Sequence, residues 1–139
     1  MKHKTLVNEL YMNPSRIESK FRSLFKEFSI GHGRIDIIGK DTNGNLCLVE
    51  VKMKDTEILS AKNQIRRYQS QLLHFLGIIG IELTLRAIVI TPSQVIDLGA
   101  RKSNALFVPQ KTPVGIPTSR EIFGLRRYEE SEKLAQIAL

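Results

Sequence analysis

The sequence has one cysteine, Cys47, no tryptophan and no long apolar run. A single cysteine cannot form an internal disulfide, and it excludes a zinc site built from several cysteines. The longest apolar stretch, residues 72–83, is interrupted by His74 and Glu82 and is shorter than the ~20 residues that a membrane span needs. No apolar segment follows residues 1–4, so we expect no secretory signal, no membrane contact and a cytoplasmic protein.

Acidic residues are fewer than basic residues. The 139 residues contain 21 Lys and Arg against 14 Asp and Glu, a formal net charge of +7. This length fits one domain, 1–139, and the apolar content of 42% excludes a disordered polyelectrolyte. A sequence pI near 9.8 is consistent with a polyanionic partner such as DNA, but also with a merely basic soluble protein.

The hydrophobic pattern predicts an α/β protein. Apolar residues from Ile17 to Phe28 recur at helical spacing, and Ser15-x-x-Glu18 has the form of a capping box. Asn43-Gly44 predicts a hairpin turn, because both central residues of a type I′ turn need positive φ. In chain order we expect a helix over 14–28, strands over 34–39 and 46–52, a helix over 56–76, a strand over 83–91, a short helix over 93–102 and a brief strand over 105–108.

Two parts of the order are less regular. A further strand near Ile30 is either present or absent, and the pattern does not decide between them. Residues 109–117 contain three prolines and predict an irregular loop. Thr118-x-x-Glu121 then predicts the start of a C-terminal helix that runs to about residue 138. The core therefore covers about 14–108, and 109–139 form a proline-containing loop and a helix.

Two carboxylates and one ammonium are expected at one end of the sheet. Side chains alternate along a strand, so Glu50 and Lys52 share a face, and Asp36 on the partner strand can reach the same place. Mg²⁺ prefers carboxylate and carbonyl oxygens, so Asp36, Glu50 and the Val51 carbonyl are candidate ligands. Lys52 could orient the attacking water or stabilise charge on a phosphate. A surface hairpin with an ordinary ion pair is the alternative.

Gly33-Arg34-Ile35-Asp36, Glu50-Val51-Lys52 and Gln64-x-x-x-Tyr68 resemble the PD-(D/E)xK nuclease superfamily, most closely its RecB-type and NucS-type branches. Ile35 stands where the nominal proline of that motif would be. The resemblance implies a restriction-endonuclease-like αβββαβ core, with a central mixed sheet flanked by helices, and divalent-metal-dependent DNA cleavage.

The resemblance also implies roles for single residues. Asp36 and Glu50 would be metal ligands, and Lys52 the catalytic lysine. Gln64 would lie near the active site. Glu18 would match the acid of the first helix, unless it only caps that helix; Glu9 is a weaker candidate for the same role.

Basic residues near these motifs are candidate DNA contacts. They could bind phosphates on either side of the cleaved bond, or form a solvated basic face. The candidates are Arg34, Lys54, Lys62, Arg66 and Arg67. His32, between two glycines, is either a phosphate contact or an ordinary loop residue, and Tyr68 is more readily explained as a core aromatic.

These features predict a nuclease that hydrolyses DNA with Mg²⁺ or Mn²⁺. No helix-turn-helix or zinc-finger signature is present, so we expect recognition of DNA structure rather than sequence. The alternatives are a Holliday-junction or branched-DNA resolvase acting as a homodimer, a non-catalytic DNA-binding module, and an accessory subunit whose residues 109–139 dock on a DNA-repair or replication protein.

Overall fold

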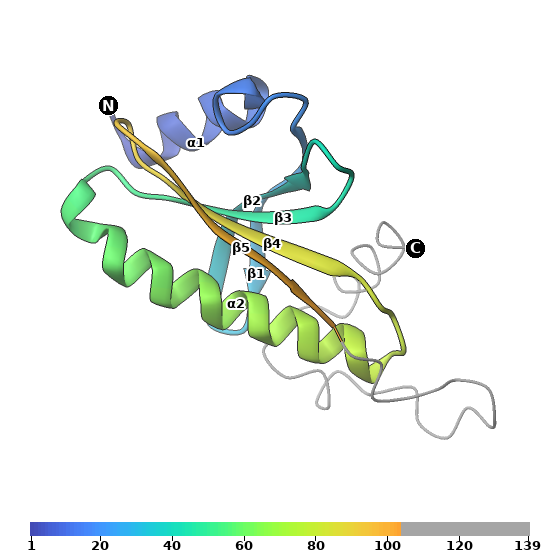
Figure 1. Cartoon of the computed structure of the whole chain (residues 1–139). Helices are drawn as coiled ribbons and strands as arrows, with labels where there is room; N and C mark the ends of the chain where they lie inside the picture. Colours follow the sequence, from blue (N-terminus) through green and yellow to red (C-terminus); the bar gives the residue numbers. More distant parts are fainter. Residues whose placement is uncertain (104–139) are drawn as a thin grey trace.

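The computed structural model describes residues 1–103. Two α-helices, two short 3₁₀ helices and five strands make up this part of the chain (Figure 1). They are α1 (His3–Met12), η1 (Pro14–Arg16), β1 (Arg22–Ile30), β2 (Gly33–Lys40), β3 (Leu46–Val51), η2 (Asp55–Glu57), α2 (Ile58–Ile78), β4 (Thr84–Ile90) and β5 (Val95–Lys102).

The strands form one mixed sheet in the order β1-β2-β3-β4-β5. Neighbouring strands are antiparallel except for β3 and β4, which are parallel. A parallel pair needs a crossover, and α2 supplies it. The expected α/β class with a mixed sheet is therefore confirmed.

The two α-helices cover opposite faces of the sheet (Figure 1). Leu6 and Leu10 of α1 pack with Val49 on one face. Ile65 and Leu72 of α2 pack on the other face, within a second cluster. Every residue of β3 is buried, as expected for a strand covered on both faces. Among residues 1–103, no helix is long and apolar enough to cross a membrane.

The hairpin between β2 and β3 is confirmed, but it is not the type I′ turn that Asn43-Gly44 predicts, because Gly44 has positive φ and Asn43 does not. Gly44 has φ 82°, and its N–H donates to the Asp41 carbonyl at 2.9 Å. The Asp41 side chain also accepts from the N–H groups of Asn43 and Asn45, which closes the turn. The strands expected over 34–39, 46–52 and 83–91 and the helix expected over 56–76 are confirmed as β2, β3, β4 and α2. The sequence left open whether a further strand lies near Ile30, and the structure has one there, β1.

The helix expected over 14–28 is wrong. Only Pro14–Arg16 forms a helical turn, and β1 begins at Arg22. A single helix would direct its apolar stripe to one core, but Phe21 packs in the α1 cluster and Phe28 in the α2 cluster. These residues lie on opposite faces of the sheet, which a strand permits and a helix does not. The N-terminal α-helix is α1, which lies before this segment and was not predicted from the sequence.

The short helix expected over 93–102 is also wrong. Residues Val95–Lys102 form β5, which pairs antiparallel with β4. Pro92-Ser93 lies in the turn of this hairpin, where the Thr91 N–H donates to the Gln94 carbonyl at 2.9 Å. The strand expected over 105–108, the loop over 109–117 and the C-terminal helix lie outside the described residues. The single-domain assignment for 1–139 stays a prediction.

Candidate active site

Asp36, Glu50 and Lys52 line one cavity of about 560 Å³. The cavity lies where β2 and β3 end their pairing, since the last partners in the register are Ile37 and Val49. The structure thus brings together the three residues that alternation along the strands had placed at one end of the sheet. The other lining residues are His3, Glu27, Ser29, His32, Gly33, Arg34, Gln64 and Tyr68.

Asp36 is fixed by the backbone of the neighbouring strand. Asp36 is 4% exposed, and its Oδ2 accepts a hydrogen bond from the Val51 N–H at 2.8 Å. Backbone pairing between β2 and β3 ends at Ile37 and Val49. Beyond it, the Val51 N–H donates to the Asp36 side chain and not to the backbone of β2. This hydrogen bond holds the Asp36 carboxylate beside the Val51 carbonyl, which is the third candidate ligand.

Glu50 is buried without full compensation. Glu50 is 4% exposed, and its Oε2 has no hydrogen-bond partner among the described residues. Burial raises the pKa of the Glu50 carboxyl well above its ordinary value, and the nearby Asp36 raises it further, while Lys52 acts in the opposite direction. An uncompensated buried carboxylate is costly unless a cation joins it.

The donor set fits a hard divalent cation. It consists of the Asp36 and Glu50 carboxylates and the Val51 carbonyl, which are the oxygen ligands that Mg²⁺ prefers. Within residues 1–103, no three His, Cys, Asp or Glu side chains already form a complete metal cluster. Mg²⁺ usually keeps several waters, so an incomplete protein shell is typical of it. Among residues 1–103 Glu50 Oε2 has no partner, so a cation held there would offset the cost of its burial.

His3 is a site residue that the sequence reading missed. Its Nε2 lies 3.3 Å from Asp36 Oδ2 and 3.0 Å from the Val51 carbonyl oxygen. It comes from α1, the helix that was not recognised. The signal was present, because His3 precedes the buried Leu6 and Leu10 by three and seven residues and so shares their helical face.

Glu27 is the second missed residue. It lies in β1, on the stretch that pairs with residues 35–37 of β2, and has φ 54°, which is unusual for a side-chain-bearing residue in a strand. Its Oε1 is 3.8 Å from Arg34 Nη1, and both residues line the cavity. No sequence signal pointed to Glu27, because its segment was interpreted as a helix.

Gln64 and Tyr68 of α2 reach the cavity from the other side. Gln64 Nε2 donates to the Tyr68 hydroxyl at 2.9 Å. Gly33 makes this possible, because a Cβ at that position would lie 2.0 Å from the Tyr68 hydroxyl oxygen. Tyr68 therefore belongs both to the core and to the wall of the site.

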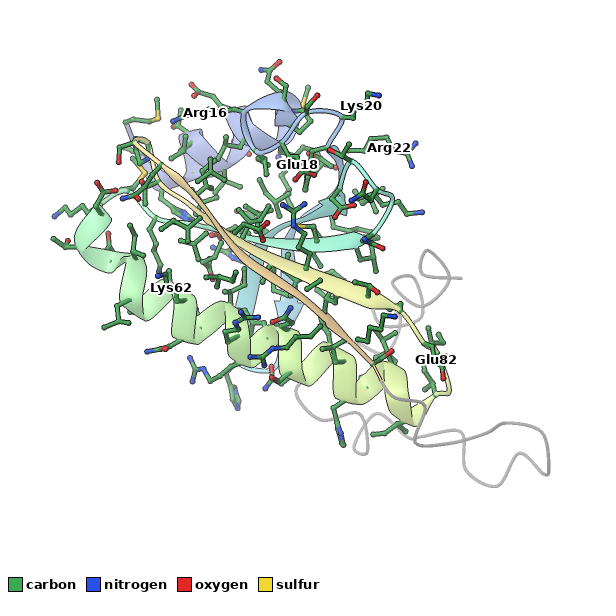
Figure 2. The ribbon with its side chains drawn as sticks, in the orientation of Figure 1. Arg16, Glu18, Lys20, Arg22, Lys62 and Glu82 are labelled. Atoms are coloured by element: carbon green, nitrogen blue, oxygen red, sulfur yellow. The ribbon has the colours of Figure 1, made fainter. Side chains whose placement is uncertain are left out.

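Glu18 is not brought to the site. Its Oε1 accepts from Arg86 Nη1 at 2.5 Å and its Oε2 from the Thr42 N–H at 2.9 Å, at the turn end of β3. Burial raises the pKa of Glu18, but these hydrogen bonds outweigh it and hold the pKa below its ordinary value. Figure 2 shows Glu18 on the side of the sheet away from Lys62 on α2. Glu9 lies on α1 beside a separate hollow.

The basic candidates differ in their surroundings. Arg34 lines the cavity, and Arg67 lines an adjoining one. Arg66 is engaged elsewhere, since its guanidinium donates to Gln69 Oε1 at 2.7 Å and to the Leu98 carbonyl of β5. Lys54 is exposed and Lys62 half-buried, and neither lines the cavity.

The mixed sheet and its cavity define an α/β domain with two buried carboxylates and a lysine gathered at one end of the sheet. The chain belongs to the family of the Endonuclease NucS C-terminal domain, whose family model matches residues 2–104. It is 34% identical over 93 residues to Endonuclease NucS of Pyrococcus horikoshii and 32% identical over 97 residues to that of Pyrococcus abyssi. These matches cover 67% and 70% of this chain, but only 34% and 36% of the relatives.

Solved structures agree with this placement. A repair endonuclease from Pyrococcus abyssi superimposes with a TM-score of 0.52 at 30% identity, covering 66% of this chain and 38% of that chain. The structure of an EndoMS–dsDNA complex gives a TM-score of 0.50 at 29% identity, covering 63% and 34%. The chain thus spans about a third of the length of the curated relatives that it matches.

Proposed function

We propose that this chain is a divalent-metal-dependent nuclease domain that hydrolyses DNA phosphodiester bonds. The observation that carries the proposal is the pair of buried carboxylates at one sheet end, with Lys52 in the same cavity and Glu50 Oε2 without a partner in the described part of the chain. Membership of the NucS C-terminal domain family and the likeness to an EndoMS–dsDNA structure support DNA as the substrate. We further propose that the fold is the restriction-endonuclease-like core of the PD-(D/E)xK superfamily.

The chain's own residues have separate tasks in this proposal. Asp36, Glu50 and the Val51 carbonyl would hold Mg²⁺ or Mn²⁺. The bound cation would polarise the scissile phosphate and lower the pKa of a coordinated water. Lys52 would stabilise charge that develops on the phosphate. Arg34, whose side chain is 54% exposed, would bind a neighbouring phosphate.

His3 and Glu27 would position these groups. His3 contacts both Asp36 and the Val51 carbonyl, so it fixes the spacing between two of the proposed ligands. Glu27 restrains Arg34 through their ion pair until a phosphate competes for the guanidinium. The predicted homodimer, the docking of residues 109–139 on a repair or replication protein and the cytoplasmic location stay predictions.

Cleavage of a DNA panel tests the proposal. Labelled single-stranded, duplex, flap and four-way-junction DNA is incubated with Mg²⁺, Mn²⁺ or EDTA and with wild type, Asp36→Asn or Lys52→Met. Lys20→Met, at an exposed turn before β1 and outside the cavity, is the matched control. We expect cleavage only with metal, a loss of about 10²-fold or more in the first two variants, and no loss in the control. Salt-sensitive binding by all proteins with no cleavage would instead favour the non-catalytic module.

A further inference from the structure

The short segment that carries Lys52 is held at both of its ends. Lys52 directly follows β3, and its N–H donates to the carbonyl of Ile90, the last residue of β4, at 2.9 Å. Three residues later, Asp55 begins η2, which continues into α2. Residues 52–54 form no helix or strand, so contacts outside the regular elements determine the path of their backbone.

Asp55 binds the turn between β4 and β5. Its Oδ1 accepts a hydrogen bond from the Thr91 hydroxyl at 2.7 Å. The Ser93 hydroxyl lies 2.9 Å from Oδ1 and 2.8 Å from Oδ2 of the same carboxylate. The Thr91 hydroxyl, followed by that of Ser93, holds the pKa of the Asp55 carboxyl below its ordinary value. We call Asp55, Thr91 and Ser93 the Asp55 clasp.

The turn to which Asp55 binds is itself well fixed. Thr91 is 1% exposed, and its N–H donates to the Gln94 carbonyl at 2.9 Å. Its hydroxyl oxygen also accepts from the Ser93 N–H at 3.3 Å. Thr91 directly follows Ile90, the residue that binds the Lys52 N–H. Two adjacent residues therefore hold Lys52 at one end and Asp55 at the other, which closes a short ring of backbone.

This ring connects two walls of the cavity. Lys52 lines the cavity directly, and α2 continues from Asp55 toward Gln64 and Tyr68, which line it from the other side. Met53 is partly buried against the α1 cluster and anchors the middle of the segment. Asp55 is exposed and does not line the cavity, so it acts on the site only through the residues that it holds.

We propose that Asp55 is a positioning residue for Lys52: the Asp55 clasp fixes the path of residues 52–54 and so directs the Lys52 side chain toward the carboxylates. The proposal rests on the proposed nuclease function, in which Lys52 stabilises charge on the phosphate. Lysine has a flexible four-carbon stem, so a backbone that pivots beneath it spreads the ammonium group over a larger volume. A misplacement of about 1 Å can cost about 10²-fold in rate.

Amide hydrogen exchange, followed by NMR on the metal-free protein, tests the clasp without cleavage. Asp55→Ala is compared with wild type and with Glu57→Ala. Glu57 is the matched control, because it carries the same charge in the same 3₁₀ helix, makes no capping hydrogen bond and does not line the cavity. We expect the Lys52 amide to exchange about tenfold faster in Asp55→Ala only, with Leu48 of β3 unchanged in both variants. Asp55→Asn keeps the Oδ1 acceptor and should restore most of the protection.

Kinetics and binding complete the test. Asp55→Ala should lower kcat of metal-dependent DNA cleavage about tenfold and leave Mn²⁺ affinity and DNA binding in EDTA unchanged, because Asp55 contacts neither ligand. Thr91→Val removes the partner hydroxyl, so it should cause the same loss alone and no further loss when combined with Asp55→Ala.

The outcomes separate this proposal from the proposed function. Equal exchange of the Lys52 amide in Asp55→Ala and Glu57→Ala would overturn the positioning role, even in a protein that cleaves DNA. An equal fall of kcat in both variants would also overturn it, because the loss would then come from the charge at the start of α2. Faster Lys52 exchange in Asp55→Ala alone, in a protein whose wild type cleaves no DNA, would remove the nuclease function and leave the clasp as the structure that orders Lys52.

Discussion

Gly33→Ala perturbs the site through one steric contact. A Cβ at residue 33 would lie 2.0 Å from the Tyr68 hydroxyl oxygen, 2.7 Å from Cζ and 2.9 Å from Cε1. Ordinary contact begins near 3.4 Å, so the hydroxyl must withdraw from 2.0 to 3.4 Å, by about 1.4 Å. The φ of Gly33 is not positive, so backbone strain does not contribute. Because Tyr68 is 7% exposed, the displacement should cost about 1–3 kcal/mol of stability.

A double-mutant cycle measured by denaturant unfolding isolates this contact. Gly33→Ala is combined with Tyr68→Leu, which removes the ring atoms that the new Cβ would meet. We expect a coupling free energy of about 1–2 kcal/mol, because the clash is absent once leucine replaces the tyrosine. Gly44→Ala is the control, since Gly44 has φ +82° and no atom within 4 Å, so its cost should not depend on the side chain at position 68. Additive losses for Gly33→Ala and Tyr68→Leu would show that this steric contact is not the source of the destabilisation.

Three further predictions concern charged side chains. Arg86→Met should lower the free energy of unfolding by about 3 kcal/mol, because it leaves the Asp41 side chain, which is 2% exposed, without its cation; chemical denaturation measures the loss. The pKa values of Glu18 and Asp97 are lowered in the folded protein, so their stabilisation is complete above the ordinary carboxyl pKa values and is lost as the pH falls through the folded ones. Thermal melts should show this loss below about pH 4, and a wild type as stable at pH 3 as at pH 6 would contradict it. Glu50→Gln should raise the free energy of unfolding of the metal-free protein at pH 8 by about 1–2 kcal/mol, because burial raises the pKa of Glu50 to about 9 and glutamine removes the cost of holding that buried carboxyl protonated; a lower melting temperature for the variant would contradict this.

The parts of the fold that could be predicted from the sequence are those whose signals are local. Asn43-Gly44 correctly predicts a hairpin, although only Gly44 has the positive φ expected of both residues, and the strands on either side alternate or are wholly apolar. The site followed from them, because Asp36 and Glu50 lie on strands joined by that turn.

The parts that were wrong depend on non-local contacts. The aromatic residues of 21–28 fit a helical period as well as a strand, and only pairing with β2 and the division of Phe21 and Phe28 between two cores select the strand. Pro92-Ser93 resembles a helix start, but the antiparallel partner β4 makes it a hairpin turn. His3 reaches the site through α1, which was not predicted, and Glu27 through β1, most of which was interpreted as a helix, so neither residue was placed at the site.

The proposed function depends above all on a single divalent-cation site formed by Asp36, Glu50 and the Val51 carbonyl. Titration of Mn²⁺ followed by electron paramagnetic resonance measures this site, because bound Mn²⁺ loses the free-ion signal. We expect saturable binding by wild type, a loss of about tenfold or more in affinity for Asp36→Asn and Glu50→Gln, and unchanged or tighter binding for Lys52→Met, which removes a nearby positive charge. Equal Mn²⁺ affinity in wild type and both carboxylate variants would mean that these carboxylates do not hold the cation.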